Sequence, residues 1–254
     1  GQDILLFMLG GDVVGRVGGP GGAIAFRVSV NGSGDVTLDQ QRAIVHSPDS
    51  GPDQTAFLAA ANLIKLTATI TAEDGDSDSA TIDIGQSLAF EDDAPEIDGR
   101  SVSNDSLQVD ETSLATNAST NFSGNFSSTY GADGPGTAVY SLNVSADGAN
   151  SGLDDTATGQ DILLYKEGSL VVGRVGGPGG EISFTVSVNP GTGVVTLDQQ
   201  RAIFHTPNTG SNQESSLASA NLIQLSATIT DKDGDSDSAT INLGQAISFR
   251  DDGP

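Results

Sequence analysis

The chain has 254 residues, with 34 acidic residues against 10 Lys and Arg, and a formal net charge of −24 at pH 7. A charge of this sign disfavours nucleic acid and anionic lipid surfaces as primary partners and favours cations. The chain contains no Cys and two His, which excludes disulfides and thiolate metal sites and leaves few ligands for a conventional zinc site.

The order of the apolar residues indicates a folded β-structure. Val, Ile and Leu form short alternating runs separated by Gly, Asn, Asp and Pro, a pattern typical of many short strands. No apolar run reaches the roughly 18 residues of a transmembrane helix, and no N-terminal signal is visible. We therefore expect a piece of a longer protein that does not insert directly into a membrane.

An internal repeat organises the sequence. Residues 1–95 align with residues 159–254, with Pro190 as a single insertion. The period, about 158 residues, is far longer than that of a solenoid repeat, so each repeat should be a domain with its own core. We expect residues 1–95 to be the C-terminal part of one repeat and residues 96–254 to be one complete repeat. Residues 96–158 are either a separate sub-module or part of one larger sandwich, and we favour the single sandwich.

The predicted elements of the first repeat are mostly strands. Ile24, Phe26, Val28 and Val30 alternate with polar or small residues, which predicts a strand with one buried face. Further along the chain, we expect one short helical turn in residues 54–62 and strands at 64–70 and 80–84.

The second repeat continues this pattern. We expect strands at residues 107–111, 121–130, 138–145 and 223–229. Strands with one polar face suit antiparallel sheets that are solvated on one side. The predicted fold class is therefore all-β, with tandem antiparallel β-sandwich modules.

The strongest chemical signal is an acidic turn that occurs twice. Asp74, Asp76 and Asp78 surround Gly75 between two predicted strands, and Asp233, Asp235 and Asp237 repeat the motif. Carboxylates at such spacing can converge on calcium, which prefers six to eight oxygen ligands. The alternative is a solvated acidic hairpin tip. The motif does not match an EF-hand, whose loop has Gly at position 6 and Glu at position 12.

More acidic residues lie at the predicted domain edge. Glu91, Asp92 and Asp93 precede Pro95, and the next repeat begins with Asp110 and Glu111. We expect calcium at this junction, where it would replace the disulfides that the chain lacks.

Several motifs resemble known families. The order of Val109-Asp110-Glu111, Asp-Gly-Asp and Asp92-Asp93-Ala94-Pro95 resembles cadherin-type and related bacterial Ig-like modules, in which calcium between domains rigidifies the chain. Tyr130–Gly134, Tyr140–Leu142, Leu217–Ile223 and Phe249–Pro254 are similar to the long tandem repeat of giant RTX adhesins. The resemblance covers nearly the whole chain, although the calcium-binding nonapeptide of RTX C-terminal regions is absent.

The resemblance implies Ig-like or cadherin-like sandwiches arranged end to end. It also implies a calcium-dependent extender of a large adhesin, secreted by a type I system and tethered to the surface of Gram-negative bacteria. Such repeats project a distal binding region for cell attachment and biofilm formation. The partners would be calcium ions and neighbouring repeats of the same monomeric chain.

The same resemblance implies the calcium ligands. At the junction they are Asp74, Asp76, Asp92, Asp93 and Glu111, with Asp78, Asp110 and Asp133 as further candidates. The equivalent set at the far end is Asp233, Asp235, Asp237, Asp251 and Asp252, whose partner Glu would lie outside this sequence.

The remaining motifs do not indicate an enzyme. The sequence has no GxSxG or HExxH motif and no Cys nucleophile. Residues 18–22 form a Gly-rich stretch without the Lys-Ser/Thr of a phosphate-binding loop, so we interpret it as an inter-strand loop. His46 and His205 occupy equivalent positions, and we expect hydrogen bonds in loops rather than metal ligation. The alternative function is a repeat that itself binds a glycan, ice or a host protein.

Overall fold

The computed structural model describes residues 2–46, 54–104, 106–206, 210 and 212–252. Two compact units make up the chain, and their bounds differ from those of the sequence repeats. Unit 1 contains Gly1–Pro95 with Tyr130–Pro135 and Asp231–Asp235, and unit 2 contains Glu96–Thr129, Gly136–Thr230 and Ser236–Pro254. Two short segments of the second repeat therefore belong to unit 1.

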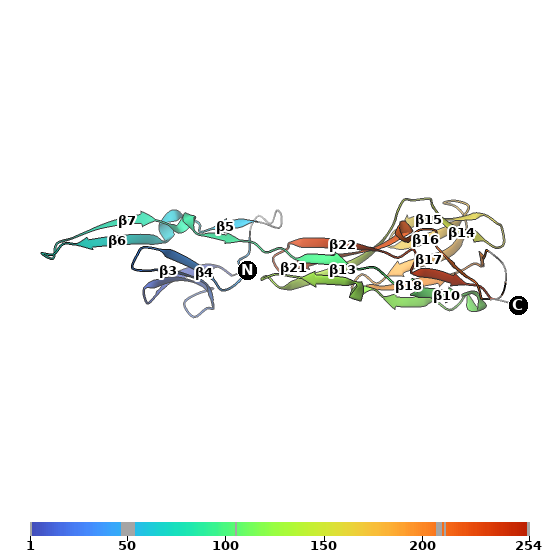
Figure 1. Ribbon diagram of the computed structural model, residues 1–254, viewed down its shortest axis with the longest axis horizontal. Helices are drawn as coiled ribbons and strands as arrows, with labels where there is room; N and C mark the ends of the chain where they lie inside the picture. The colour runs from blue at the N-terminus through green and yellow to red at the C-terminus, as the bar shows by residue number, and fades with distance from the viewer. Residues whose placement is uncertain (1, 47–53, 105, 207–209, 211, 253–254) are drawn as a thin grey trace. The chain divides into compact units, whose positions relative to one another are not determined.

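The described residues form β-strands and short 3-10 helices but no α-helix (Figure 1). In the described residues the strands pair antiparallel apart from one parallel pair, β10 (Leu107–Asp110) with β23 (Ile247–Arg250). The predicted all-β class is thus confirmed. In the described part of the chain, no helix has the length and apolar character needed to cross a bilayer.

Unit 1 contains a four-stranded antiparallel sheet in the order β1-β2-β3-β4 and two separate strand pairs, β5 with β8 and β6 with β7. Its elements are β1 (Ile4–Leu9), β2 (Asp12–Val17), β3 (Ile24–Val30), β4 (Val36–Gln40), β5 (Thr55–Phe57), η1 (Ala61–Leu63), β6 (Lys65–Thr71), β7 (Ser77–Asp83), η2 (Gly85–Ser87) and β8 (Ala89–Glu91).

The core of unit 1 is small. Phe26 and Val28 of β3 pack with Ile64 and with Phe90 of β8, and the rings of Phe26 and Phe90 lie 4.9 Å apart between centroids. This contact joins the four-stranded sheet to the β5–β8 pair, which carries the segment that ends at Pro95.

Unit 2 contains a seven-stranded sheet in the order β11-β18-β17-β16-β15-β14-β19, with three smaller sheets, β10-β23-β20, β13-β21-β22 and β12-β9. Its elements are β9 (Glu96–Gly99), β10 (Leu107–Asp110), η3 (Glu111–Ser113), β11 (Ala118–Asn121), η4 (Ser123–Asn125), β12 (Phe126–Thr129), β13 (Pro135–Val144), β14 (Ala149–Asp155), β15 (Asp161–Glu167), β16 (Leu170–Val175), β17 (Ile182–Val188), β18 (Val194–Gln199), β19 (Ile203–Phe204), β20 (Glu214–Ser216), η5 (Ala220–Leu222), β21 (Ile223–Asp231), β22 (Ser236–Asn242) and β23 (Ile247–Arg250).

One continuous apolar core fills unit 2. It joins residues of the seven-stranded sheet, such as Phe184 and Leu197, to Leu225 of β21 and Phe249 of β23. Phe184 and Phe249 repeat the aromatic contact of unit 1, with centroids 5.0 Å apart. Because the core lies between the large sheet and the smaller ones, this unit has the packing of a β-sandwich.

The predicted strands correspond to observed ones with two differences. Residues 121–130 do not form one strand, because Ser123–Asn125 make a 3-10 turn that separates β11 from β12. Residues 54–62 were predicted to supply a helical turn, but Thr55–Phe57 are the strand β5 and only the last part enters η1. In both places a local turn interrupts a run of residues that the sequence pattern treats as continuous.

Candidate metal centre

Four aspartates and one histidine gather in unit 1. His46, Asp92 and Asp233 have potential ligand atoms within 4.8 Å of one another, and so do Asp133, Asp231 and Asp233. We call these five residues cluster A. Asp233 belongs to both triads, so the five side chains form one continuous group.

Three turns hold the carboxylates of cluster A. Asp92 directly follows β8, and its N–H donates to Gln54 O at 2.9 Å. Asp231 ends β21 and Asp233 lies in the turn that follows, where Gly234 N–H donates to Asp231 Oδ1 at 3.0 Å. Asp133 lies in the 130–135 segment before β13. The cluster is therefore formed by segments that are far apart in the sequence.

Several polar atoms of cluster A are buried without a partner. Asp92 Oδ2, Asp231 Oδ2 and Asp233 Oδ1 have no hydrogen bond to any described residue. Asp92 Oδ1 lies 3.2 Å from His46 Nδ1, and the side chains of Asp92 and His46 are only 2% and 3% exposed. Burying unpaired carboxylates is unfavourable unless they coordinate a cation. In the ionised form and without a cation, these carboxylates would therefore lower the stability of the fold.

The pKa values in cluster A reflect the burial and the close spacing of its carboxylates. Burial raises the pKa of Asp133, and repulsion from Asp92 and Asp231 adds to the increase. Burial, a hydrogen bond with Asp231 and repulsion from Asp133 raise the pKa of Asp233 to about 6. Both shifts favour the neutral carboxyl group, as expected for like charges that are held close together away from water.

These shifts predict how the stability of the metal-free protein depends on pH. Since folding raises the pKa of Asp233 to about 6, the folded state binds protons more tightly than the unfolded state. Stability in EDTA should therefore increase as the pH falls from 7 through 6 to 5, by about 1 kcal/mol, because the folded state takes up most of one proton over this range and the unfolded state takes up almost none. Thermal melts in EDTA measure this, and Asp233→Asn should weaken the dependence. A wild-type melting temperature that falls over this range would contradict the prediction.

A second group lies in unit 2. Glu111, His205 and Asp251 have potential ligand atoms within 4.8 Å of one another, and we call these three residues cluster B. The Oε1 atom of Glu111 accepts hydrogen bonds from Ile203 N at 2.7 Å and from Gln199 Nε2 at 2.8 Å. Glu111 is thus already well hydrogen-bonded, and cluster B contains fewer candidate ligands than cluster A.

Neighbouring residues position Glu111. Asp110 caps the short helix η3, since its carboxylate accepts a hydrogen bond from Thr112 N at 2.9 Å. Hydrogen bonding to Thr112 lowers the pKa of Asp110. This carboxylate therefore has a local structural role at the start of the turn that contains Glu111.

The structure groups the predicted ligands differently from the two sets that the sequence predicts. Asp92, Asp133 and Asp233 belong to cluster A, whereas Glu111 and Asp251 belong to cluster B. Asp93 lies beside cluster A, where its carboxylate accepts a hydrogen bond from Ala132 N at 3.1 Å. The turn that meets Asp92 in unit 1 is the acidic turn of the second repeat, not that of the first.

The remaining predicted ligands lie outside both clusters among the described residues. Asp235 is buried in the same turn as Asp233, whereas Asp237 accepts a hydrogen bond from Ile97 N at 2.9 Å, and Asp252 is exposed. The first acidic turn is exposed throughout, and it contains Asp74, Asp76 and Asp78.

Three cluster residues were missed at the level of sequence. Asp231 aligns with Ala72 of the first repeat, so it is not part of the acidic motif that the two repeats share. His46 and His205 do make the expected hydrogen-bond contacts, with Phe90 O at 3.1 Å and Ser215 Oγ at 3.0 Å. Both are also buried and lie beside carboxylates. Their equivalent positions, each upstream of an Asp-Asp pair, were the available signal.

A glycine holds Asp93 beside cluster A. Gly131 has a φ of +58°, and a Cβ atom there would lie 2.5 Å from Asp93 Oδ2. We expect Gly131→Ala to destabilise the fold by about 2 kcal/mol through backbone strain and this clash, as measured by chemical denaturation. Gly10→Ala is the control, because Gly10 has a φ of +66° with open space around it. Equal losses of stability in the two variants would contradict the role of the Asp93 contact.

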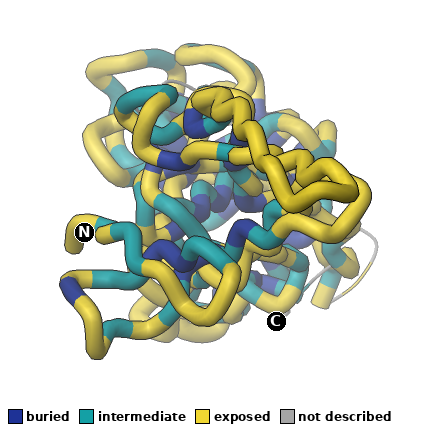
Figure 2. Tube along the Cα trace, turned by 90° about the vertical axis from the view of Figure 1, so that its left-hand side faces the viewer, coloured by how far each residue is buried: buried dark blue, intermediate teal, exposed yellow. Residues whose placement is uncertain are grey.

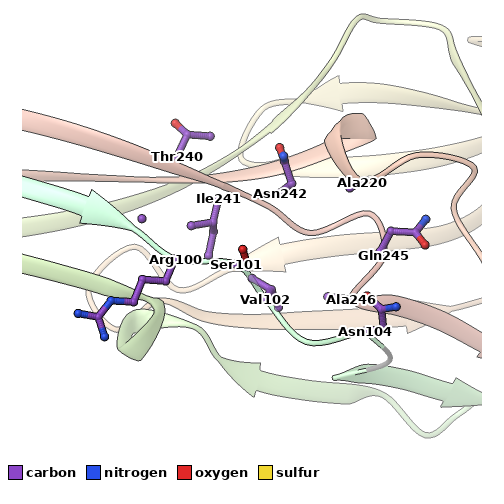
Figure 3. A pocket seen from close by; sticks show the side chains of 11 residues that line it. Arg100, Ser101, Val102, Asn104, Ala220, Thr240, Ile241, Asn242, Gln245 and Ala246 are labelled. Carbon is purple, nitrogen blue, oxygen red and sulfur yellow. The ribbon is translucent and has the colours of Figure 1, made fainter.

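A hollow in unit 2 offers no comparable chemistry (Figure 3). Its walls include Arg100, Val102, Thr240, Ile241 and Gln245, and no Asp, Glu or His is among the lining residues. Cluster A is therefore the strongest candidate site in the described residues.

Comparison with known proteins gives a family match. The model of the family described as "Domain of unknown function (DUF5801)" matches residues 1–85 and 106–244. No curated protein and no solved structure matches the chain significantly. Because the matched segments cover most of the sequence, the chain belongs to the DUF5801 family.

Proposed function

We propose that cluster A binds calcium and that the bound ion stabilises the fold. The observation that carries the proposal is the set of buried carboxylate oxygens on Asp92, Asp231 and Asp233 without a hydrogen-bond partner among the described residues. A divalent cation would neutralise the repulsion that raises the pKa values of Asp133 and Asp233.

The ligand types favour calcium over other common cations. Calcium binds carboxylate and carbonyl oxygens, six to eight in number, with flexible geometry. Cluster A contains four aspartates, and the chain has no Cys. Magnesium requires a near-ideal octahedron and retains several waters, so an irregular group of carboxylates from three turns suits it less.

A calcium ion here would act as a structural cross-link. Its ligands would come from residue 92 in the first repeat and from residues 133, 231 and 233 in the second. Such an ion would connect distant parts of a chain without disulfides. This arrangement supports a structural rather than a catalytic role.

We further propose that the chain is a spacer repeat of a large bacterial surface adhesin. Support comes from the resemblance to giant RTX adhesins and from the sequence repeat. Extracellular calcium modules bind with a Kd of roughly 10⁻⁴ to 10⁻³ M, so the site would be empty inside the cell and loaded outside it. This behaviour fits a chain that a type I system secretes in the unfolded state and that folds with calcium at the cell surface.

Calorimetric titration tests the metal assignment. Calcium added to the EDTA-treated and dialysed wild-type chain should give saturable binding, and magnesium should bind more weakly. Asp231→Asn should weaken calcium binding at least tenfold, because it removes a buried anionic ligand. Asp78→Asn, on the exposed turn, is the control and should bind like the wild type. Equal calcium affinity in the wild type and in Asp231→Asn would overturn the assignment to cluster A.

A further inference from the structure

Two hairpins of nearly the same sequence differ in burial. The β6–β7 hairpin of unit 1 aligns with the β21–β22 hairpin of unit 2. Ile70 is 73% exposed, whereas its counterpart Ile229 is 2% exposed. Ile82 is 59% exposed, whereas its counterpart Ile241 is 4% exposed. The same apolar face is therefore covered in unit 2 and open in unit 1.

The face of β21–β22 is covered by the beginning of the second repeat. The strand β13 lies next to β21 in the same sheet. On the other strand, Ile97 N of β9 donates to Asp237 Oδ2 at 2.9 Å. Figure 3 shows the Ile241 side chain directed toward the segment that carries Ser101 and Val102. Residues 97–144 thus supply both an additional strand and an apolar cover.

No described segment has these roles at the first hairpin. β6 and β7 form a two-stranded sheet of their own, and every residue of β7 is exposed. Figure 1 labels the two strands, and Figure 2 colours much of the tube nearest the viewer as exposed. An isolated pair of strands is marginally stable in water, and an open edge with exposed isoleucines readily accepts another strand.

The sequence of the open face is preserved. β6 and β21 share Leu-x-Ala-Thr-Ile-Thr, and β7 and β22 share Ser-Asp-Ser-Ala-Thr-Ile. The differences between the paired strands are Lys65 for Gln224, Thr67 for Ser226 and Asp83 for Asn242. Residues 97–144 pack against a set of side chains on β21–β22. The same set is thus also present on β6–β7.

We propose that the β6–β7 hairpin is a docking face for a segment with the sequence of residues 96–144, as the matching hairpin β21–β22 is for residues 96–144 themselves. The segment adds a strand beside β6, as β13 does beside β21, and covers Ile82 as the segment around Val102 covers Ile241. The recognition is strand addition combined with apolar packing. It does not depend on calcium at cluster A, so it goes beyond the proposed function.

Binding in trans is the first test. A labelled peptide of residues 96–145 is titrated against the full chain in EDTA and, separately, in calcium. We expect saturable 1:1 binding in both buffers, because β21–β22 is already covered. The double variant Ile70→Asp/Ile82→Asp should lose binding at least tenfold, and a peptide with Leu142→Asp should also bind poorly, since Leu142 is a core residue of unit 2. Peptide binding that is undiminished in the double variant would overturn the proposal.

Covalent linkage is the second test, and it does not require the peptide to remain soluble. Residues 96–158 are fused before Gly1, at the position they occupy before Gly159. Amide hydrogen exchange in β6 and β7 should slow at least tenfold relative to the unfused chain. Unchanged exchange would overturn the proposal. A second result would also overturn the proposal: the unfused chain forms a dimer, and Ile70→Asp/Ile82→Asp abolishes that dimer. In that case the open face pairs with a second copy of itself.

Discussion

Calcium should raise the melting temperature of the wild-type chain by roughly 5 to 10 °C. A ligand that binds only the folded state stabilises it by about 2.7 kcal/mol at a hundredfold excess over its Kd, and 1 kcal/mol corresponds to roughly 2 to 4 °C for a domain of 150 to 250 residues. Asp233→Asn should lose much of this gain. In EDTA, however, it should be as stable as the wild type or more stable, because it removes one of the charges crowded in cluster A. Differential scanning calorimetry in EDTA and in millimolar calcium measures both effects.

The repeat provides a matched control for this variant. Asp74 occupies the position of Asp233 in the first repeat, but it lies on the exposed turn. Asp74→Asn should leave both the stability in EDTA and the calcium response unchanged within about 0.5 kcal/mol, as for most surface substitutions. An equal loss of the calcium response in Asp74→Asn and Asp233→Asn would contradict the placement of the site in cluster A.

Phe184→Ala should destabilise unit 2 by about 3 to 5 kcal/mol. Phe184 is fully buried and packs against Phe249, and truncation of a buried Phe loses apolar burial and leaves a cavity. The ring also lies over Gly173, where a Cβ atom would be 2.5 Å from it. Backbone at this site therefore already approaches the ring closely. Chemical denaturation followed by circular dichroism measures the loss.

Two further variants serve as comparisons in this experiment, one in the core of unit 1 and one at an exposed position of unit 2. Phe26→Ala removes the equivalent ring of unit 1 and should lower the stability of unit 1, as seen in the hydrogen exchange of β1–β4. Phe204→Ala should cost less than about 1 kcal/mol, because Phe204 is 46% exposed. If Phe184→Ala were no more harmful than Phe204→Ala, the described core of unit 2 would be wrong.

Much of the fold could be predicted from alternation and repetition. The alternation of Ile24, Phe26 and Val28 predicted a strand, and this segment is β3. The single strand predicted at 121–130 was wrong, because Ser123–Asn125 form a turn. A strand pattern averages over several residues, whereas one tight turn depends on local backbone geometry. The exposure of Ile70 was also unpredictable from alternation, since Ile229 has the same sequence context and is buried.

The chemistry of the candidate site could be predicted from the sequence, but the set of residues that form it could not. Sequence spacing indicated that an acidic turn meets Asp92, but the two acidic turns are identical from Asp74 to Asp78 and from Asp233 to Asp237. Only tertiary structure decides which of them lies beside Asp92. His46 lies in no acidic motif. Asp231 extends the alternating aspartates of the second turn by one step, but it has no counterpart in the first repeat, where Ala72 stands in its place. Their contributions depend on burial next to Asp92 and Asp233, which the sequence does not reveal.

A crystal structure of the wild-type chain grown in millimolar calcium tests the central claim most directly. The account predicts an ion between the carboxylates of Asp92, Asp133, Asp231 and Asp233, with metal–oxygen distances of roughly 2.3 to 2.6 Å as is typical of calcium. Water alone between these carboxylates, at a calcium concentration that raises the melting temperature, would contradict it.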